Sequence, residues 1–163
     1  MRILRLAARV LVLLPLLAWL TPSAAAPAPQ PFQADSLQRI VQIRQGKPFL
    51  LVLWSLDCSV CMKELDTWSG LLKKQPKLNL VLISTDAPEL AGEAAAVLEM
   101  RGLGAAESWI FAEGDSPELR YAVDPSWYGE LPRSYFYEAN GQRRAVSGAI
   151  EEAELNRWAT DQK

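Results

Sequence analysis

The chain has 163 residues, of which 50% are hydrophobic, with 17 Lys and Arg, 19 Asp and Glu, and no histidine. This length favours one globular domain and leaves no room for a second. The slight acidic excess excludes nucleic acid as an expected partner, because a nucleic-acid-binding domain needs a basic face to meet phosphate.

The first 26 residues have the organisation of a secretory signal peptide. Three arginines and no acid precede an apolar run at residues 10–20, and Ser23-Ala24-Ala25-Ala26 offers small residues for cleavage. The run is shorter than the roughly 20 apolar residues of a membrane-spanning helix. We therefore expect cleavage near Ala26 and a periplasmic location. An uncleaved, membrane-anchored signal is the alternative.

Removal of this segment would take away three arginines and no acid, which changes the net charge from −2 to −5. Residues 27–34 begin with Pro27-Ala28-Pro29-Gln30-Pro31, and this composition predicts a short, stiff, extended tether. The folded domain is then expected to comprise residues 35–163.

The first part of this domain alternates helices with strands. A helix is predicted after Asp35, where apolar residues recur at helical spacing. Phe49–Trp54 and Leu78–Ile83 are continuous apolar runs, typical of strands buried on both faces. Cys58–Lys74, between them, predicts a long amphipathic helix.

The second part predicts a helix from Asp86, which forms a capping-box-like start with Glu89, to Gly102. A short strand at Trp109–Ala112 and a short helix from Ser116 follow. Strands at Tyr135–Glu138 and Arg143–Val146 flank Asn140-Gly141, a strong hairpin signal, and Glu151–Thr160 predicts a final helix. This order predicts an α/β fold with a mixed central sheet and helices on both faces.

Cys58 and Cys61 are the only cysteines, and they lie where a predicted buried strand meets the start of a helix. The unpaired amides and the positive end of the helix dipole favour a thiolate there, so Cys58 is the expected attacking thiol. Cys61 lies one turn inside and can resolve a mixed disulfide. A purely structural disulfide is the alternative, although a bridge that encloses two residues constrains the unfolded chain little.

The sequence predicts no cofactor and no resident metal. Covalent haem needs a histidine after the pair, where Met62 stands instead, and a zinc site needs more ligands than two thiols. A non-enzymatic module that binds copper(I) through two thiolates, or binds a partner chain, stays open as an alternative.

The segment Phe49–Leu65 resembles the active-site segment of the thioredoxin superfamily, and more narrowly that of bacterial periplasmic TlpA-like proteins. The resemblance implies a thioredoxin fold in which residues 87–112 form a helix-strand insert. It also implies a thiol:disulfide oxidoreductase that reduces disulfides of exported proteins with electrons from a membrane donor. A disulfide donor, which runs the same chemistry in reverse, is the alternative. We expect this protein to be a monomer.

Pro132 resembles the family's cis-proline, which lies beside the cysteine pair and keeps that edge open to an extended partner segment. Leu131 would then offer its backbone to the partner. The segment before Pro132 is longer than the family leads us to expect, and its aromatic residues either border the partner groove or cover the core. The remaining partner-binding candidates beside Leu131 are Trp54, Asp57, Trp127 and Tyr128.

Asp57 departs from the family pattern, since an aromatic residue usually precedes the first cysteine. Its negative charge next to Cys58 opposes the helix-dipole effect on the thiol pKa. The pair Ser59-Val60 between the cysteines does not predict the redox potential.

Glu64 is the last catalytic candidate. At 100° per residue it projects between Trp68 and Leu71, among the apolar residues of the predicted helix. It also occupies the place of the glutamate that follows the cysteine pair in TlpA-like proteins. We expect a proton acceptor and donor for Cys61, with a solvated carboxylate at the edge of the apolar face as the alternative.

Overall fold

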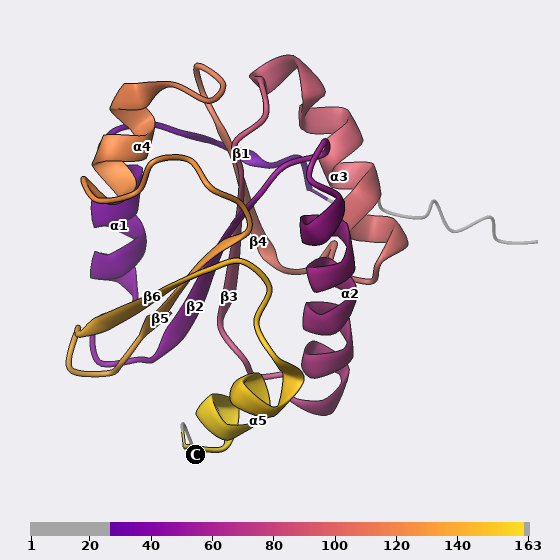
Figure 1. The fold of residues 1–163 in the computed structure, drawn as a ribbon, viewed down its shortest axis with the longest axis vertical. Helices are drawn as coiled ribbons and strands as arrows, with labels where there is room; N and C mark the ends of the chain where they lie inside the picture. Colours follow the sequence, from indigo (N-terminus) through magenta and orange to yellow (C-terminus); the bar gives the residue numbers. More distant parts are fainter. Residues whose placement is uncertain (1–26, 162–163) are drawn as a thin grey trace, which may run out of the picture.

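The computed structural model describes residues 27–161, which form one six-stranded sheet between two helical layers (Figure 1). The strands are β1 (Gln30–Phe32), β2 (Phe49–Trp54), β3 (Leu80–Ser84), β4 (Glu107–Phe111), β5 (Arg133–Tyr137) and β6 (Arg143–Ser147). The helices are α1 (Ser36–Ile43), α2 (Ser59–Lys74), the 3₁₀ turn η1 (Pro88–Leu90), α3 (Ala91–Met100), α4 (Pro117–Val123) and α5 (Glu152–Asp161).

The strand order is β1-β4-β3-β2-β5-β6, which places β2 in the interior of the sheet. Strands β1, β4, β3 and β2 run parallel, while β5 is antiparallel to both β2 and β6. The prediction of a mixed sheet is therefore confirmed, as are the helix that follows β2 and the hairpin at Asn140-Gly141.

Two apolar cores lie on opposite faces of the sheet. One is covered by α2, α3 and α5 and the other by α1 and α4. All six residues of β2 are buried, because this central strand packs against both helical layers. The loop after β2 is thus held by a rigid frame, and it leads directly into α2.

The prediction of a tether at residues 27–34 is wrong at Gln30–Phe32, which pairs with β4 as an edge strand. Phe32 is fully buried and stacks on Phe111. Pro31, which has no backbone N–H, is compatible with an edge strand, because the side of the strand that faces away from the sheet forms no hydrogen bonds to a neighbouring strand. The folded unit therefore begins before residue 35. The predicted signal peptide, residues 1–26, lies outside the described residues, and none of the described helices is long and apolar enough to cross a membrane.

The predicted helix and strand between residues 87 and 112 both form, as η1 and α3 followed by β4. The predicted capping role of Asp86 is wrong: Ala87 occupies the N-cap position of η1, and no side chain caps this turn. The carboxylate of Asp86 is used elsewhere, as described below.

Candidate functional site

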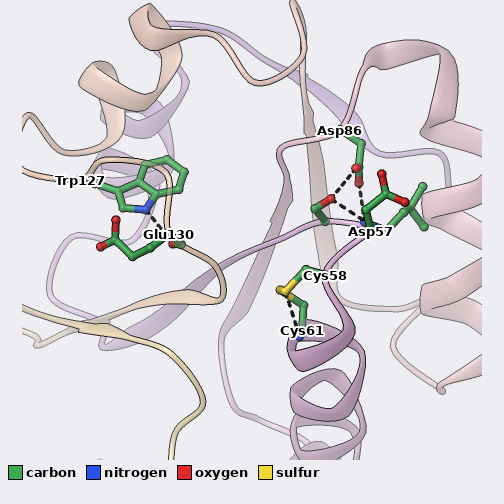
Figure 2. Close-up of a disulfide and its surroundings, with 8 residues drawn as sticks. Asp57, Cys58, Cys61, Asp86, Trp127 and Glu130 are labelled. Carbon is green, nitrogen blue, oxygen red and sulfur yellow. Dashed lines mark hydrogen bonds between the residues drawn. A yellow bond between two sulfur atoms is a disulfide. The ribbon is translucent and has the colours of Figure 1, made fainter.

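A disulfide joins Cys58 and Cys61 at the start of α2, with 5.1 Å between the two Cα atoms (Figure 2). Cys58 is the N-cap residue of this helix, and its Sγ accepts a hydrogen bond from the backbone N–H of Cys61 at 3.1 Å. Cys58 is partly exposed, whereas Cys61 is only 1% exposed. The two sulfurs therefore differ in access, as the assigned roles of attacking and resolving thiol require.

The loop between β2 and α2 is tied to the end of β3. The carboxylate of Asp86 accepts hydrogen bonds from Ser55 Oγ at 2.7 Å and from the backbone N–H of Leu56 at 3.0 Å (Figure 2). Asp57, the next residue, is exposed. Thus the chain that leads into Cys58 is fixed, while an acidic side chain beside it faces solvent.

Glu64 lies within the core on the α2 side of the sheet and is 3% exposed. Burial raises the pKa of its carboxyl to about 7, although the hydrogen bond from the Ile150 amide at 3.1 Å and the nearby Trp68 indole both lower it. Glu64 Oε2 and Trp68 Nε1 have no hydrogen-bond partner of strict geometry among the described residues. The alternative of a solvated carboxylate is contradicted by this burial, and the proton-transfer role stays a prediction.

The Leu131–Pro132 peptide bond is cis, as the resemblance implies. Leu131 is partly buried and packs against both cores. Trp54 and Trp127 are 1% and 4% exposed, so these indoles lie within the protein, whereas Tyr128 is 88% exposed. For Trp127 the structure favours the alternative of core cover. Contact of Leu131, Asp57 and Tyr128 with a partner stays a prediction.

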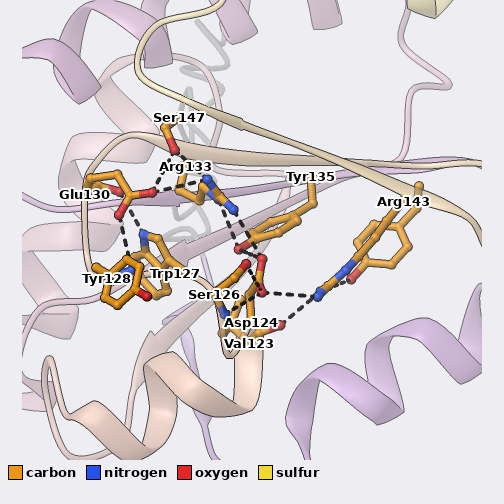
Figure 3. Close-up of polar contacts among 11 residues, drawn as sticks. Val123, Asp124, Ser126, Trp127, Tyr128, Glu130, Arg133, Tyr135, Arg143 and Ser147 are labelled. Carbon is orange, nitrogen blue, oxygen red and sulfur yellow. Dashed lines mark hydrogen bonds and ion pairs between the residues drawn. The ribbon is translucent and has the colours of Figure 1, made fainter.

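An ionic cluster around the buried carboxylate of Asp124 holds the segment that leads to Pro132 (Figure 3). Asp124 Oδ2 accepts a hydrogen bond from the Tyr135 hydroxyl at 3.0 Å and contacts the Arg133 guanidinium at 3.2 Å. Its Oδ1 accepts hydrogen bonds from the backbone N–H and hydroxyl of Ser126 and faces Arg143 at 3.7 Å. Burial raises the pKa of Asp124, but these hydrogen bonds and the charge of Arg143 outweigh it and lower the pKa to about 2.

The far end of this segment is fixed as well. Arg133 also contacts Glu130, whose carboxylate accepts hydrogen bonds from Ser147 Oγ at 2.7 Å and from the Tyr128 amide at 3.2 Å. The indole N–H of Trp127 donates to the Glu130 carbonyl at 2.9 Å. Tyr128, which is 88% exposed, therefore extends from a segment whose backbone is held by hydrogen bonds.

The Asp124 cluster predicts a specific loss of stability in acid. Since the folded pKa of about 2 lies below the usual 3.8, the group stabilises the fold above pH 4, and this contribution is lost as the pH falls through 2. The shift corresponds to about 2 kcal/mol. Urea unfolding of the oxidised protein at pH 7, 4 and 2.5 should show that Asp124→Asn lowers stability at pH 7 and flattens the acid slope. Parallel curves for the wild type, Asp124→Asn and the control Asp115→Asn would contradict this expectation.

The sequence did not predict a role at the site for Asp86, Asp124, Arg133 or Arg143. Asp86 follows a buried strand, and the carboxyl ends of parallel strands meet at one edge of a sheet, so its approach to the loop after β2 could have been predicted. No local pattern marks the other three residues, because their contacts join the end of α4 to the two strands of the hairpin.

No protein family profile matches the chain, and no curated protein matches it either. Solved structures do. A secreted disulfide oxidoreductase of Mycobacterium tuberculosis, homologous to Escherichia coli DsbE, is 21% identical, with a TM-score of 0.59 over 74% of this chain and 85% of its own. A thiol:disulfide interchange protein of the thioredoxin family from Chlorobium tepidum is 18% identical, with a TM-score of 0.60 over 75% and 83%.

StoA from Bacillus subtilis is 15% identical, with a TM-score of 0.53 over 70% of this chain and 83% of its own. Each of these structures covers at least 70% of this chain and at least 83% of its own. The chain therefore has the thioredoxin-like fold that the segment Phe49–Leu65 implies.

Proposed function

We propose that this protein is a thiol:disulfide oxidoreductase that exchanges disulfides with exported partner proteins. The observation that carries the proposal is the asymmetry of the pair, with a partly exposed Cys58 at the helix start and a covered Cys61 one turn inside. A structural bridge needs no such difference in access, whereas ordered attack and resolution do. The names of the similar solved proteins support the same chemistry.

In the reducing direction, the thiolate of Cys58 attacks one sulfur of the client disulfide. A bond forms between Cys58 Sγ and that sulfur, and the second client sulfur leaves as a thiolate. Cys61 then loses its proton and attacks Cys58 Sγ, which releases the first client sulfur. The client disulfide has gained two electrons, and the protein ends with the Cys58–Cys61 disulfide seen in the structure.

We favour reduction of client disulfides over their formation. The protein then acts as a monomer in the periplasm and receives its electrons from a donor in the membrane. Asp57 supports this direction, because a negative charge beside Cys58 disfavours its thiolate and thereby favours the disulfide form of the pair. A disulfide donor would gain from the opposite arrangement, in which the reduced form is stabilised. Leu131 and Tyr128, which precede the cis bond, are the proposed contacts of the client.

The function is tested by reduction of insulin disulfides with dithiothreitol as the electron source. We expect the wild-type protein to accelerate the reaction and the double variant Cys58→Ala, Cys61→Ala to have no effect beyond dithiothreitol alone. Equal activity of the double variant would contradict the proposal and favour a binding module. Equilibration with a glutathione buffer tests the direction: a reductant stays largely oxidised in it, and a disulfide donor becomes largely reduced.

A further inference from the structure

We propose that Asp86 is a positioning residue for the attacking thiol: it fixes the loop Ser55–Asp57 so that Cys58 Sγ lies over the amide of Cys61. The proposal deepens the proposed function and rests on Cys58 as the nucleophile. Its basis is a set of contacts between two strand ends, which the resemblance to known proteins does not predict.

Strands β2 and β3 end side by side, with Trp54 paired to Ser84. Immediately after them, Asp86 reaches across and accepts hydrogen bonds from Ser55 Oγ and Leu56 N–H. The carboxylate is itself held, because Ser84 Oγ donates to Asp86 Oδ2 at 2.5 Å and accepts from the Asp86 amide at 3.0 Å. Asp86 is thus anchored to β3 while it holds the loop that follows β2.

As a consequence, three successive backbone N–H groups of the loop donate hydrogen bonds to acceptors other than Cys58 Sγ. Leu56 N–H donates to Asp86, Asp57 N–H to Ser55 Oγ at 3.3 Å, and Cys58 N–H to the Ser55 carbonyl at 3.2 Å. Ser55 Oγ can accept from Asp57 in this orientation because its proton points to Asp86. The donor that the structure shows on Cys58 Sγ is the Cys61 amide. That single contact depends on where the loop places Cys58.

The charge and the hydrogen bonds of Asp86 have opposite effects on the thiol. Asp57 directly precedes Cys58 and Asp86 binds the loop before it, and a negative charge disfavours a thiolate. Loss of the charge alone should therefore lower the pKa of Cys58. Loss of the positioning contacts should raise that pKa, because the thiolate loses a fixed donor from the helix start. The two effects can be separated by substitution.

The test measures the pH dependence of Cys58 alkylation by iodoacetamide in the reduced protein, with the modified cysteine identified by mass spectrometry. Asp86→Ala should shift the midpoint to higher pH and slow alkylation at pH 7 about tenfold, since the thiolate is the reacting species and its fraction falls about tenfold for each unit by which the thiol pKa rises. Asp86→Asn should restore the rate to within about threefold, because its amide oxygen can accept from Leu56 and its Nδ2 can donate to Ser55. Glu89→Ala, an exposed acid in η1, is the control for net charge and should match the wild type.

An Asp86→Ala midpoint equal to or below that of the wild type would overturn the proposal, as would an Asp86→Asn variant that is as slow as Asp86→Ala. Should Asp86→Ala fail to fold, Ser55→Ala decides the matter. It keeps every charge and removes the hydroxyl that joins Asp86 to the Asp57 amide, so the midpoint must still rise. Alkylation needs no client protein, so an inactive wild type in the insulin assay would contradict the proposed function without altering this result.

Discussion

The Cys61→Ser variant is expected to accumulate mixed disulfides with its partner proteins, whereas Cys58→Ser should form none. Cys58 is the accessible sulfur, so it makes the first bond to a client. This mixed disulfide is resolved when Cys61 attacks Cys58 Sγ. Cys61 lies one helical turn away, within reach of that sulfur, as the Cys58–Cys61 disulfide shows. Without this intramolecular thiol, release depends on slow attack by thiols from solution.

The measurement is a non-reducing gel of each variant after incubation with periplasmic protein, followed by mass spectrometry of the captured species. Dithiothreitol must dissolve the new bands, and the double cysteine variant must lack them. Both single variants should also lose insulin reduction down to the level of dithiothreitol alone. Equal trapping by Cys58→Ser would reverse the assigned roles of the two thiols.

Local patterns in the sequence were sufficient for the elements that carry the site. The apolar run Phe49–Trp54 became the central strand β2, and the helical spacing after Cys58 became α2, because both patterns reflect burial against neighbours on each side. Helical spacing also placed Glu64 among apolar residues, which the structure confirms. The cis bond before Pro132 could be predicted only through the resemblance, since trans is the commoner form of any X-Pro bond.

The missed features depend on contacts between distant parts of the chain. Gln30–Phe32 has the proline content of an extended linker, and only its pairing with β4 makes it a strand. Asp86 has the local sequence of a helix cap, but the loop after β2 offers its carboxylate better donors than the start of η1 does. In both cases the local interpretation was reasonable, and tertiary contacts outweighed it.

Glu64→Gln is expected to slow disulfide exchange about 10²-fold while it stabilises the oxidised protein. Resolution requires Cys61 to lose a proton in an apolar surrounding, where an unassisted thiolate is costly. A carboxyl with a pKa of about 7 can accept that proton and return it near neutral pH, and such general acid-base assistance contributes about 10² to 10⁴ in rate. Glutamine keeps the shape and the acceptor for the Ile150 amide but cannot carry the proton.

The same pKa fixes the sign of the stability effect. Because the folded value of about 7 lies above the usual 4.5, the contribution of Glu64 to stability is greatest below pH 4.5 and is lost as the pH rises through 7, by about 3 kcal/mol in all. Glutamine removes this loss, since no buried charge then forms. Urea unfolding of the oxidised proteins should therefore give similar stabilities at pH 4 and a more stable variant at pH 8.

The pH profile of disulfide exchange and the stability at pH 8 together show whether Glu64 transfers a proton or only packs in the core. The pH profile of exchange should lose its inflection near 7 in Glu64→Gln, while Glu93→Gln, the same substitution at an exposed position of α3, should leave both the rate and the stability unchanged. A variant that is stabilised at pH 8 but exchanges disulfides at the wild-type rate and pH profile would show that Glu64 is a buried carboxyl without a role in proton transfer. Slow exchange with an unchanged inflection would assign the titration to another group.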